Sequence, residues 1–428
     1  MGNKDLRRGS NEVSDEPRDS HNLVLLTSGV IGVAMLLPMN FYFNADSYWK
    51  YKWRRLDNVT QPFDLDKFWG SNMSLVSMGA NFLCHLINIL VGHRFSTRPR
   101  ILASLGLNIL LFAVSTVFTR INTDSWQLGF YGLTLSFALL FNINDSVFQG
   151  AFTTIIARFP SRFMGAMMQG QGLGGILSSG LSVILLLLGS GDTVEVATWY
   201  FVFATIFLLV SLLFYIMVNY ISFYKHFLGN EKELGIQSQA ENQSTSPLGH
   251  LKVVKKIWKL MISIFLVYVL NMSVYPALAR LAEPVHESEK WKVYFLPVGV
   301  FFAFNFLDFI GRIVAGFVKW PKPTGSGSNL CLLFSVLRFI FVPLLLLCNL
   351  SPDDRKVTKV LIESDSVFLL IHALMSVTSG YMVTITMITA PMMVEDRDRS
   401  VVGSLMVFML VFGLLSGAAL SFLWISLL

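Results

Sequence analysis

Three polar side chains stand at helical spacing inside a long apolar stretch of this sequence. Asn305, Asp308 and Arg312 are separated by three and four residues in a run from Val293 to Val318 that is otherwise almost entirely apolar. On an α-helix this spacing places them within an arc of about 60°. A charge at the centre of a bilayer costs roughly 3 to 10 kcal/mol, so such residues are rare and commonly functional. The pattern therefore predicts a polar helix face turned toward protein or water and away from lipid.

A second stretch repeats the same spacing with similar chemistry. Asn142, Asp145 and Gln149 place an amide, an acid and a second amide on one helix face. Both stripes could line a polar cavity near the bilayer midplane, where transported solutes bind. The structural alternative is that Asp308 and Arg312 neutralise each other, while the amides bridge helices for about 0.6–2 kcal/mol each. For the two stripes together we favour the cavity.

The composition identifies an integral membrane protein. Of the 428 residues 54% are hydrophobic and only 14% are charged, whereas soluble domains carry about 25% charged residues. Long apolar runs predict membrane-spanning helices rather than barrel strands, and so an all-α membrane protein in a lipid bilayer. The Lys and Arg residues are scattered over short loops, which argues against a nucleic-acid partner.

No catalytic or metal-binding set stands out in the sequence. The three cysteines all fall inside apolar segments, and His85 and His372 lie in separate runs without a carboxylate or thiol at ligand spacing. Serine is abundant, but none of the serines has a nucleophile-elbow context. We therefore expect no metal, no cofactor and no enzymatic activity.

The apolar runs predict eleven transmembrane helices in a 6+5 arrangement. A polar cytoplasmic tail (1–21) precedes a six-helix half (22–224), and a cytoplasmic linker (225–256) separates it from a five-helix half (257–428). Two helical halves around a central path are a common transporter plan, and we expect a major-facilitator-like architecture. The predicted spans are about 22–44, 68–92, 100–119, 126–157, 163–189, 197–220, 257–282, 293–318, 329–350, 366–391 and 400–427.

Loop charges predict the orientation of the chain. With the N-terminus inside, the inside loops hold more Lys and Arg than the outside loops, as the positive-inside rule requires. An odd number of spans then puts the C-terminus outside. The first outside loop carries Asn58-Val59-Thr60, a glycosylation sequon that fits an extracellular face. The plasma membrane is the expected location.

A glycine-rich segment has two interpretations. Gly170-Gln171-Gly172-Leu173-Gly174-Gly175 matches the G-x-G-x-x-G pattern of dinucleotide-binding proteins. That pattern needs a preceding strand, whereas this one lies within a predicted membrane helix. Small residues let helices approach closely in lipid, so close helix packing is the better interpretation.

Five sequence motifs are informative together. The two most specific are Phe304-Asn305-Phe306-Leu307-Asp308-Phe309-Ile310-Gly311-Arg312 and Arg338-Phe339-Ile340-Phe341-Val342-Pro343-Leu344-Leu345-Leu346-Leu347-Cys348-Asn349. The other three are Leu36-Leu37-Pro38, Gly170-Gln171-Gly172-Leu173 and Ser379-Gly380-Tyr381. Through these motifs the chain resembles the equilibrative nucleoside transporter family, over nearly its whole length.

The resemblance implies facilitated, energy-independent transport of purine or pyrimidine nucleosides by alternating access. It implies that Gln149 contacts the nucleobase edge, and that Asp308 and Arg312 contact the ribose hydroxyls. The chemistry agrees, because an amide both donates and accepts while a carboxylate accepts from two hydroxyls. Leu36, Met78 and Leu414 match apolar positions around the ligand, and Phe301 and Asn305 are candidates to line the same cavity. We expect a monomer to be the functional unit.

Two residues depart from the family pattern. Met39 replaces the tryptophan that usually follows the first-span proline, so base contact there would lack an indole ring. Asp145 stands where the family generally has a small residue. Our hypothesis is that it alters selectivity or couples uptake to protons, and the alternative function is a nucleobase or organic-cation transporter. A membrane receptor or enzyme is disfavoured, since the charged groups concentrate within the spans.

Overall fold

The computed structural model describes residues 17–54, 65–188, 193–228, 247–275, 278–351, 355 and 359–426. These residues form helices, apart from loops and two isolated β-bridges. The predicted all-α fold is therefore confirmed for the described part of the chain. The long helices are α1 (Leu23–Asn44), α3 (Leu65–Val91), α4 (Thr97–Arg120), α5 (Gln127–Ile156), α6 (Ser161–Leu188), α7 (Thr193–Val218), α10 (Pro247–Val274), α12 (Ala303–Phe317), α13 (Gly325–Leu337), α15 (Asp365–Met392) and α16 (Arg399–Ser426).

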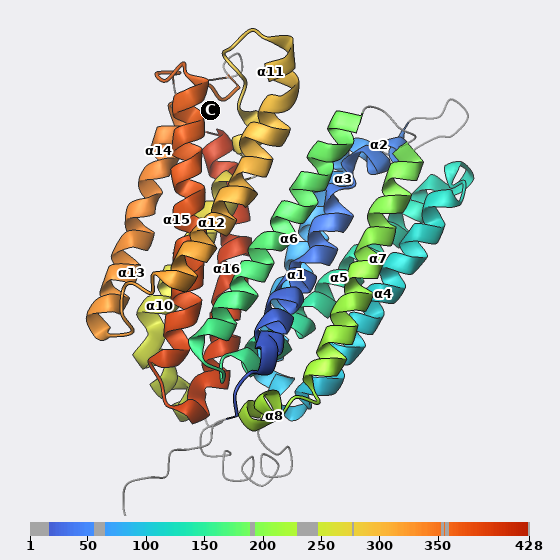
Figure 1. Ribbon diagram of the computed structural model, residues 1–428. Coiled ribbons are helices and arrows are strands. Elements are labelled where there is room, and N and C mark those ends of the chain that lie inside the picture. The colour runs from blue at the N-terminus through green and yellow to red at the C-terminus, as the bar shows by residue number, and fades with distance from the viewer. Residues whose placement is uncertain are drawn as a thin grey trace, which may run out of the picture.

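The helices gather into two groups that follow the order of the chain. Figure 1 shows α1 to α7 on one side of the bundle and α10 to α16 on the other. Within the first group α1 packs along α6 and α4 packs on α5 and α7. Within the second group α10 pairs with α16 and α12 pairs with α15. Contacts between the groups run from α12 and α15 to α6, and from α16 to α3 and α5.

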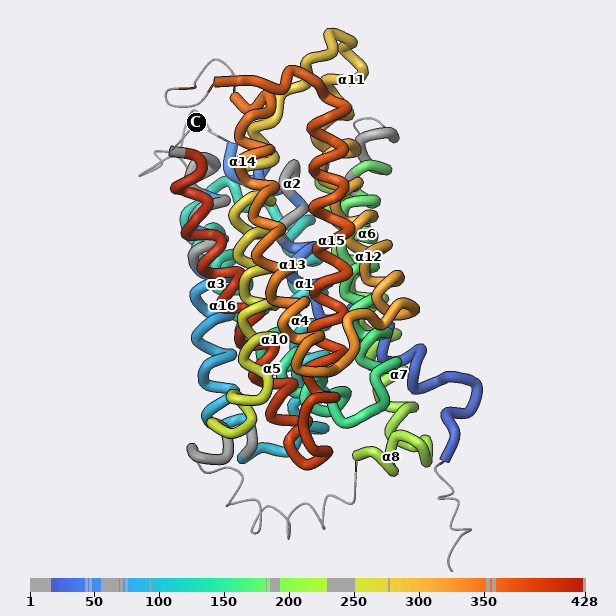
Figure 2. Tube along the Cα trace, turned by 90° about the vertical axis from the view of Figure 1, so that its left-hand side faces the viewer, coloured from blue at the N-terminus to red at the C-terminus, as the bar shows by residue number. Residues whose placement is uncertain are grey.

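Short helices mark the two ends of the bundle. The helix α8 (Ser222–Leu228) lies at the end where α1 begins, whereas α2 (Asp46–Trp53) and α11 (Glu289–Tyr294) lie at the opposite end, together with the C-terminus (Figures 1 and 2). The first and last described residues thus lie at opposite ends. An odd number of membrane crossings gives this arrangement.

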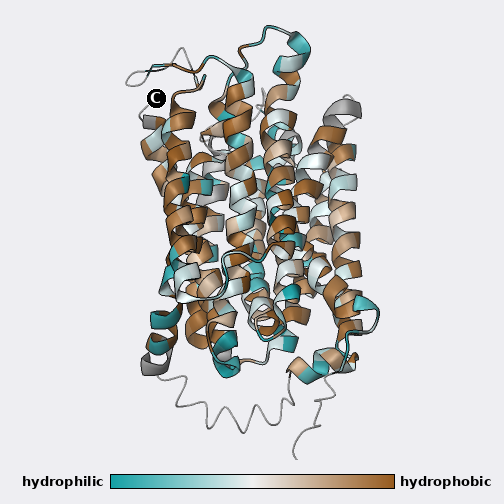
Figure 3. Cartoon of the chain, turned by 60° about the vertical axis from the view of Figure 1, so that its left-hand side comes forward, coloured by the Kyte–Doolittle hydropathy of each residue, from teal (hydrophilic) through white to brown (hydrophobic). Residues whose placement is uncertain are grey.

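Nine helical segments of the described residues are long and apolar enough to cross a membrane. The helices α3 and α6, of 27 and 28 residues, lie in the same bundle but are not among these nine, so the total of eleven stays a prediction. Figure 3 shows apolar residues along the lengths of the helices and hydrophilic ones mainly at their ends. Large apolar side chains such as Leu213 and Phe422 are exposed on the outside of the bundle, as a lipid environment favours.

The glycine-rich segment of α6 serves helix packing. A Cβ atom placed on Gly170 would collide with the carbonyl oxygen of Gly29 in α1, and one on Gly32 would collide with the carbonyl oxygen of Met167. The backbones of α1 and α6 therefore touch at this crossing, which only glycine permits. The dinucleotide interpretation is excluded by the continuous helix around the motif.

Helices flank the predicted linker between the halves at its described ends. The helix α8 covers Ser222–Leu228, and α10 begins at Pro247, ten residues before the predicted start of the span at 257. Proline favours the first turn of a helix, where its missing N–H has no intrahelical partner to lose. Residues 229–246 lie outside the described part.

A π-helix leads into the helix that carries the first polar stripe. Phe295–Phe302 adopt this wider winding and continue directly into α12. π-helical segments are rare and are found frequently at functional sites. The sequence pattern predicted a regular helix throughout, and this break was not anticipated.

Candidate functional site

The centre of the candidate site is a buried ion pair within α12. The Nε of Arg312 lies 2.6 Å from Oδ2 of Asp308, one helical turn away. Both residues are less than a tenth exposed, whereas Phe306 and Phe317 on other faces of the same helix are exposed. The burial of Asp308 and Arg312 agrees with the predicted orientation of the stripe, toward protein or water and away from lipid.

Arg312 also joins the two halves of the protein. Its Nη1 donates a hydrogen bond of 3.1 Å to the backbone oxygen of Met168 in α6. A Cβ atom on Gly172 would lie 2.7 Å from Cδ of Arg312, so the absence of a side chain on α6 makes room for the guanidinium. The ion pair therefore sits at the interface of the halves, where a transporter must open and close.

Asn305 occupies the same interface nearer the π-helix. Its Nδ2 donates to the hydroxyl of Tyr275 at 3.2 Å and to the carbonyl of Phe301 at 3.0 Å. A Cβ atom on Gly175 of α6 would meet its Oδ1. The face of α6 that carries Gly172 and Gly175 thus covers the stripe of α12.

Three further polar residues form a chain of hydrogen bonds that ends at Asp308. Its Oδ1 accepts a hydrogen bond of 2.9 Å from Ser379 of α15, and the Ser379 oxygen accepts one of 2.6 Å from Asn271 of α10. Asn271 in turn contacts Arg338, which is buried between α13 and α14 (Phe341–Leu346). None of these three residues was predicted as a site residue. An arginine inside a predicted span was a signal that could have found Arg338.

The second stripe, on α5, contacts two different neighbours. Gln149 is buried and lies against His85 of α3. Asp145 instead accepts a hydrogen bond of 2.8 Å from Asn108 of α4. Asn142 donates to the carbonyl of Ala138 in its own helix, at 2.8 Å. The three residues of this stripe therefore bond to three different groups.

Asn108 belongs to a buried polar cluster between α4 and α5. Its Oδ1 accepts from Asn144 at 2.7 Å, and Asn144 also donates to the backbone oxygen of Ser104 at 2.7 Å. No Lys or Arg of the described residues forms an ion pair with Asp145. The carboxyl group of Asp145 is thus held by an amide between two helices of one half.

The polar groups of the two stripes bond to different neighbours. Within the described ranges, no hydrogen bond or ion pair links Gln149 or Asp145 of α5 to Asp308 or Arg312 of α12. Their predicted meeting in one cavity therefore stays a prediction.

The remaining predicted ligand residues are half-buried. They come from α1, α3, the π-helix and α16, and therefore from both halves. Phe301 packs edge-on against Tyr275, with ring centroids 5.7 Å apart. Partial burial is compatible with lining a path, although nothing in the described contacts brings all of them together. These residues are Leu36, Met39, Met78, Phe301 and Leu414.

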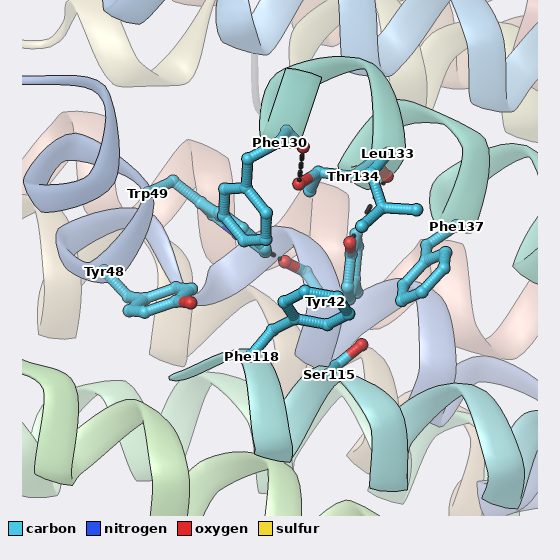
Figure 4. Close-up of a pocket in the computed structure, with 9 residues that line it drawn as sticks. All are labelled: Tyr42, Tyr48, Trp49, Ser115, Phe118, Phe130, Leu133, Thr134 and Phe137. Carbon is cyan, nitrogen blue, oxygen red and sulfur yellow. Dashed lines mark hydrogen bonds between the residues drawn. The ribbon is translucent and has the colours of Figure 1, made fainter. Parts of the chain in front are cut away.

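A small aromatic pocket lies apart from these residues, between α1, α2, α4 and α5 (Figure 4). Tyr42 donates to the carbonyl of Thr134 at 3.3 Å, and Trp49 donates to the carbonyl of Tyr42 at 2.8 Å. None of the predicted substrate residues lines it. Its contacts fix α2 against the ends of α1 and α5. The lining residues are Tyr42, Tyr48, Trp49, Ser115, Phe118, Phe130, Leu133, Thr134 and Phe137.

The structure leaves the predicted glycosylation site untested. Asn58, the proposed glycosylation site, lies outside the described residues. Among the residues that are described, no group of three His, Cys, Asp or Glu side chains could hold a metal ion.

The arrangement of helices matches a known fold. The fold is that of the major facilitator superfamily: the proton:xylose symporter XylE superposes with a TM-score of 0.65 at 12% identity, covering 94% of this chain and 88% of that one. FucP in its outward conformation gives a TM-score of 0.59 at 12% identity, covering 94% of this chain and 91% of that one. The expected major-facilitator-like architecture is confirmed.

The sequence then places the chain in a family. The family model described as nucleoside transporter matches residues 135–426. Human equilibrative nucleoside transporter 2 is 28% identical over 97% of this chain and 99% of its own length. Human equilibrative nucleoside transporter 1 is 25% identical over 96% of this chain and 98% of its own length. The chain belongs to the equilibrative nucleoside transporter family, a multi-pass integral membrane protein family, and the resemblance noted in the sequence is confirmed.

Proposed function

We propose that this protein carries nucleosides across a membrane down their concentration gradient, without coupling to another solute. Membership of the family supports the substrate class and the equilibrative mode. The observation that carries the proposal is the buried Asp308–Arg312 pair at the interface of the two halves. A solute bound there would be reached from either side as the halves rock, which is alternating access.

The chemistry of the site suits a nucleoside. A carboxylate has about four lone-pair sites, and two hydrogen bonds to Asp308 come from Arg312 and Ser379. The remaining acceptor capacity would take the ribose hydroxyls. Gln149, which lies against His85, would read the edge of the base, because its amide both donates and accepts. Asn305, Phe301, Leu36, Met39, Met78 and Leu414 would surround the ligand.

We place the protein in the plasma membrane as a monomer, with the N-terminus cytoplasmic and the C-terminus extracellular. The excess of basic residues in the predicted inside loops supports this orientation. The positions of the first and last described residues at opposite ends of the bundle fit it as well. Asn58 would then be glycosylated in the first extracellular loop.

A second candidate function is transport of nucleobases or organic cations, with proton coupling through Asp145. The observation that favours it is a buried carboxyl group whose contact is an amide rather than a cation of the described residues. Uncharged nucleosides do not require this acid.

Uptake of labelled uridine and adenosine into transport-deficient cells separates the two candidates. Saturable nucleoside uptake that persists without a sodium or proton gradient supports the proposal. Uptake of organic cations or nucleobases with no nucleoside flux would replace it by the second candidate. Surface biotinylation ensures that a lack of flux is not a lack of protein.

A further inference from the structure

The second buried arginine of the C-terminal half lies beyond the proposed ligand residues. Arg338 opens the short 3-10 segment Arg338–Ile340, which breaks the helix between α13 and α14. It is 4% exposed, and no carboxylate of the described residues lies within ion-pair distance of it. A buried guanidinium is costly in a membrane and needs a reason.

The contacts of Arg338 hold it in one orientation. Its Nη2 donates to Oδ1 of Asn271 at 3.0 Å and to the carbonyl of Met375 at 3.1 Å. Its Nε donates to the hydroxyl of Thr378 at 3.2 Å. That hydroxyl in turn donates to the carbonyl of Leu374 at 2.8 Å. In each of these three hydrogen bonds Arg338 is the donor.

The donor-only character of arginine fixes the direction of the next hydrogen bonds. Because a guanidinium cannot accept, Asn271 must turn its Oδ1 toward Arg338 and its Nδ2 toward Ser379. The Nδ2 atom lies 2.6 Å from Oγ of Ser379. Ser379 is then the acceptor on that side, so its single proton is free to point toward Oδ1 of Asp308, 2.9 Å away.

We infer that Arg338 is a positioning residue, which acts through Asn271 and Ser379 to hold Asp308 as an ionised acceptor for the substrate. The chain of bonds runs in one direction, from the guanidinium to the carboxylate, and such bonds polarise and strengthen one another. This inference rests on the proposed role of Asp308 in binding the sugar hydroxyls. It adds three residues, from three other elements, to the determinants of sugar recognition.

The orientation of Asn271 depends on the charge at position 338. A glutamine there could donate or accept, so Asn271 could turn over and present Oδ1 to Ser379. Ser379 would then donate to Asn271 instead of Asp308, and the carboxylate would lose a donor. A lysine at 338 donates only, as arginine does, and leaves the direction unchanged.

The test compares Arg338→Gln with Arg338→Lys in uptake of uridine and of 2′,3′-dideoxyuridine. For Arg338→Gln we expect the KM for uridine to rise about tenfold while the maximal rate per surface molecule changes little. The KM for 2′,3′-dideoxyuridine, which lacks the hydroxyls that Asp308 would bind, should stay within about twofold of the unchanged protein. Arg338→Lys should keep the uridine KM near its original value.

Ser379→Ala tests the same chain with minimal change of volume. Its matched control is Ser376→Ala, one turn away in α15, because Ser376 is equally buried but donates only to His372 within its own helix, at 2.8 Å. Ser379→Ala should show the uridine-selective loss and Ser376→Ala should not. The double variant Arg338→Gln/Ser379→Ala should have a KM for uridine no higher than that of the poorer single variant. Both substitutions interrupt the same chain of hydrogen bonds to Asp308, so their effects should not add.

Equal losses for both substrates in Arg338→Gln and Ser379→Ala would overturn the inference, since a packing defect does not distinguish them. An unchanged uridine KM in Ser379→Ala would also overturn it, even if Arg338→Gln failed to reach the surface. If the unchanged protein carried no nucleoside, the proposed function would fail first and this inference with it. If the unchanged protein carried nucleosides but the variants kept its KM for uridine, this inference would be rejected and the proposed function would stand.

Discussion

Arg312 and Asp308 form an ion pair of 2.6 Å within one helix, while the same guanidinium donates to the backbone of Met168 in the opposite half. One side chain thus neutralises the acid and touches the surface against which its helix packs. Removing either partner leaves the other charge buried and uncompensated, which costs about 3–5 kcal/mol in buried pairs. The pair therefore connects the proposed ligand site with the contact between halves.

We predict that Asp308→Ala and Arg312→Ala each lower nucleoside uptake by at least about a hundredfold, because both remove proposed ligand groups. The double variant should recover surface expression relative to the poorer single variant, since it leaves no lone charge, but should not recover transport. Uptake normalised to surface protein measures both quantities. Transport in the double variant would mean that the pair only stabilises the fold.

The control for these variants is the exposed pair of Arg54 and Asp124. Their side chains lie 2.7 Å apart but are about one third exposed. An exposed pair contributes about 0–1 kcal/mol, so Arg54→Ala should leave uptake nearly unchanged.

Gly172→Ala should impair transport through the contact with α12. The new methyl group would lie 2.7 Å from Cδ of Arg312, and the guanidinium would have to move. We expect uptake of uridine to fall roughly tenfold, since overpacking at a close contact costs about 1–3 kcal/mol. Gly174→Ala is the matched control, because its nearest contact, the Val33 carbonyl oxygen, is 3.4 Å away. Equal effects of the two variants would argue against a role of the Arg312 contact.

Gln149→Ala should weaken base recognition while leaving the helix intact. Loss of one or two hydrogen bonds to a ligand costs about 1–2 kcal/mol, so the KM should rise roughly tenfold with little change in maximal rate. Ser136→Ala serves as the control on the same helix, since Ser136 donates only to the carbonyl of Gly132, at 2.9 Å. An unchanged KM for both purine and pyrimidine nucleosides would remove Gln149 from the site.

Asp145→Asn should preserve surface expression, because an amide oxygen can still accept from Asn108. Asp145→Leu cannot accept, leaves a buried amide donor unpaired at a cost of about 1–3 kcal/mol, and should lower expression. The substrate profile and pH dependence of Asp145→Asn decide its role. Unchanged behaviour would restrict Asp145 to packing of α4 and α5, whereas lost pH dependence would favour proton coupling.

The features that depend on hydrophobicity and helical spacing could be predicted from the sequence. The orientation of the stripe of Asn305, Asp308 and Arg312 could be predicted from the sequence, because a charged side chain that faces lipid is energetically costly. The close packing at Gly170 was predicted from the small residues in a membrane helix. The major-facilitator-like architecture was predicted from the two helical halves. The family was predicted from the sequence motifs.

The partners of these side chains were beyond such reasoning. Ser379 and Asn271 are ordinary polar residues on other helices, and only the packing of α10, α12 and α15 brings them to Asp308. Asp145 and Gln149 lie on one predicted face of α5, but one helix face can contact two neighbouring helices. Here Asp145 contacts Asn108 of α4 and Gln149 contacts His85 of α3. The hydrophobic pattern of the sequence did not indicate the π-helix before α12.

The most direct test of the central claim is uridine flux into liposomes that contain the purified protein. With no sodium or proton gradient, labelled uridine should enter saturably until its internal concentration equals the external one. Unlabelled nucleoside on one side should accelerate exchange, and Asp308→Ala liposomes should match protein-free ones. Absence of protein-dependent uridine flux, or accumulation above the external concentration only when a proton gradient is imposed, would contradict an equilibrative nucleoside transporter.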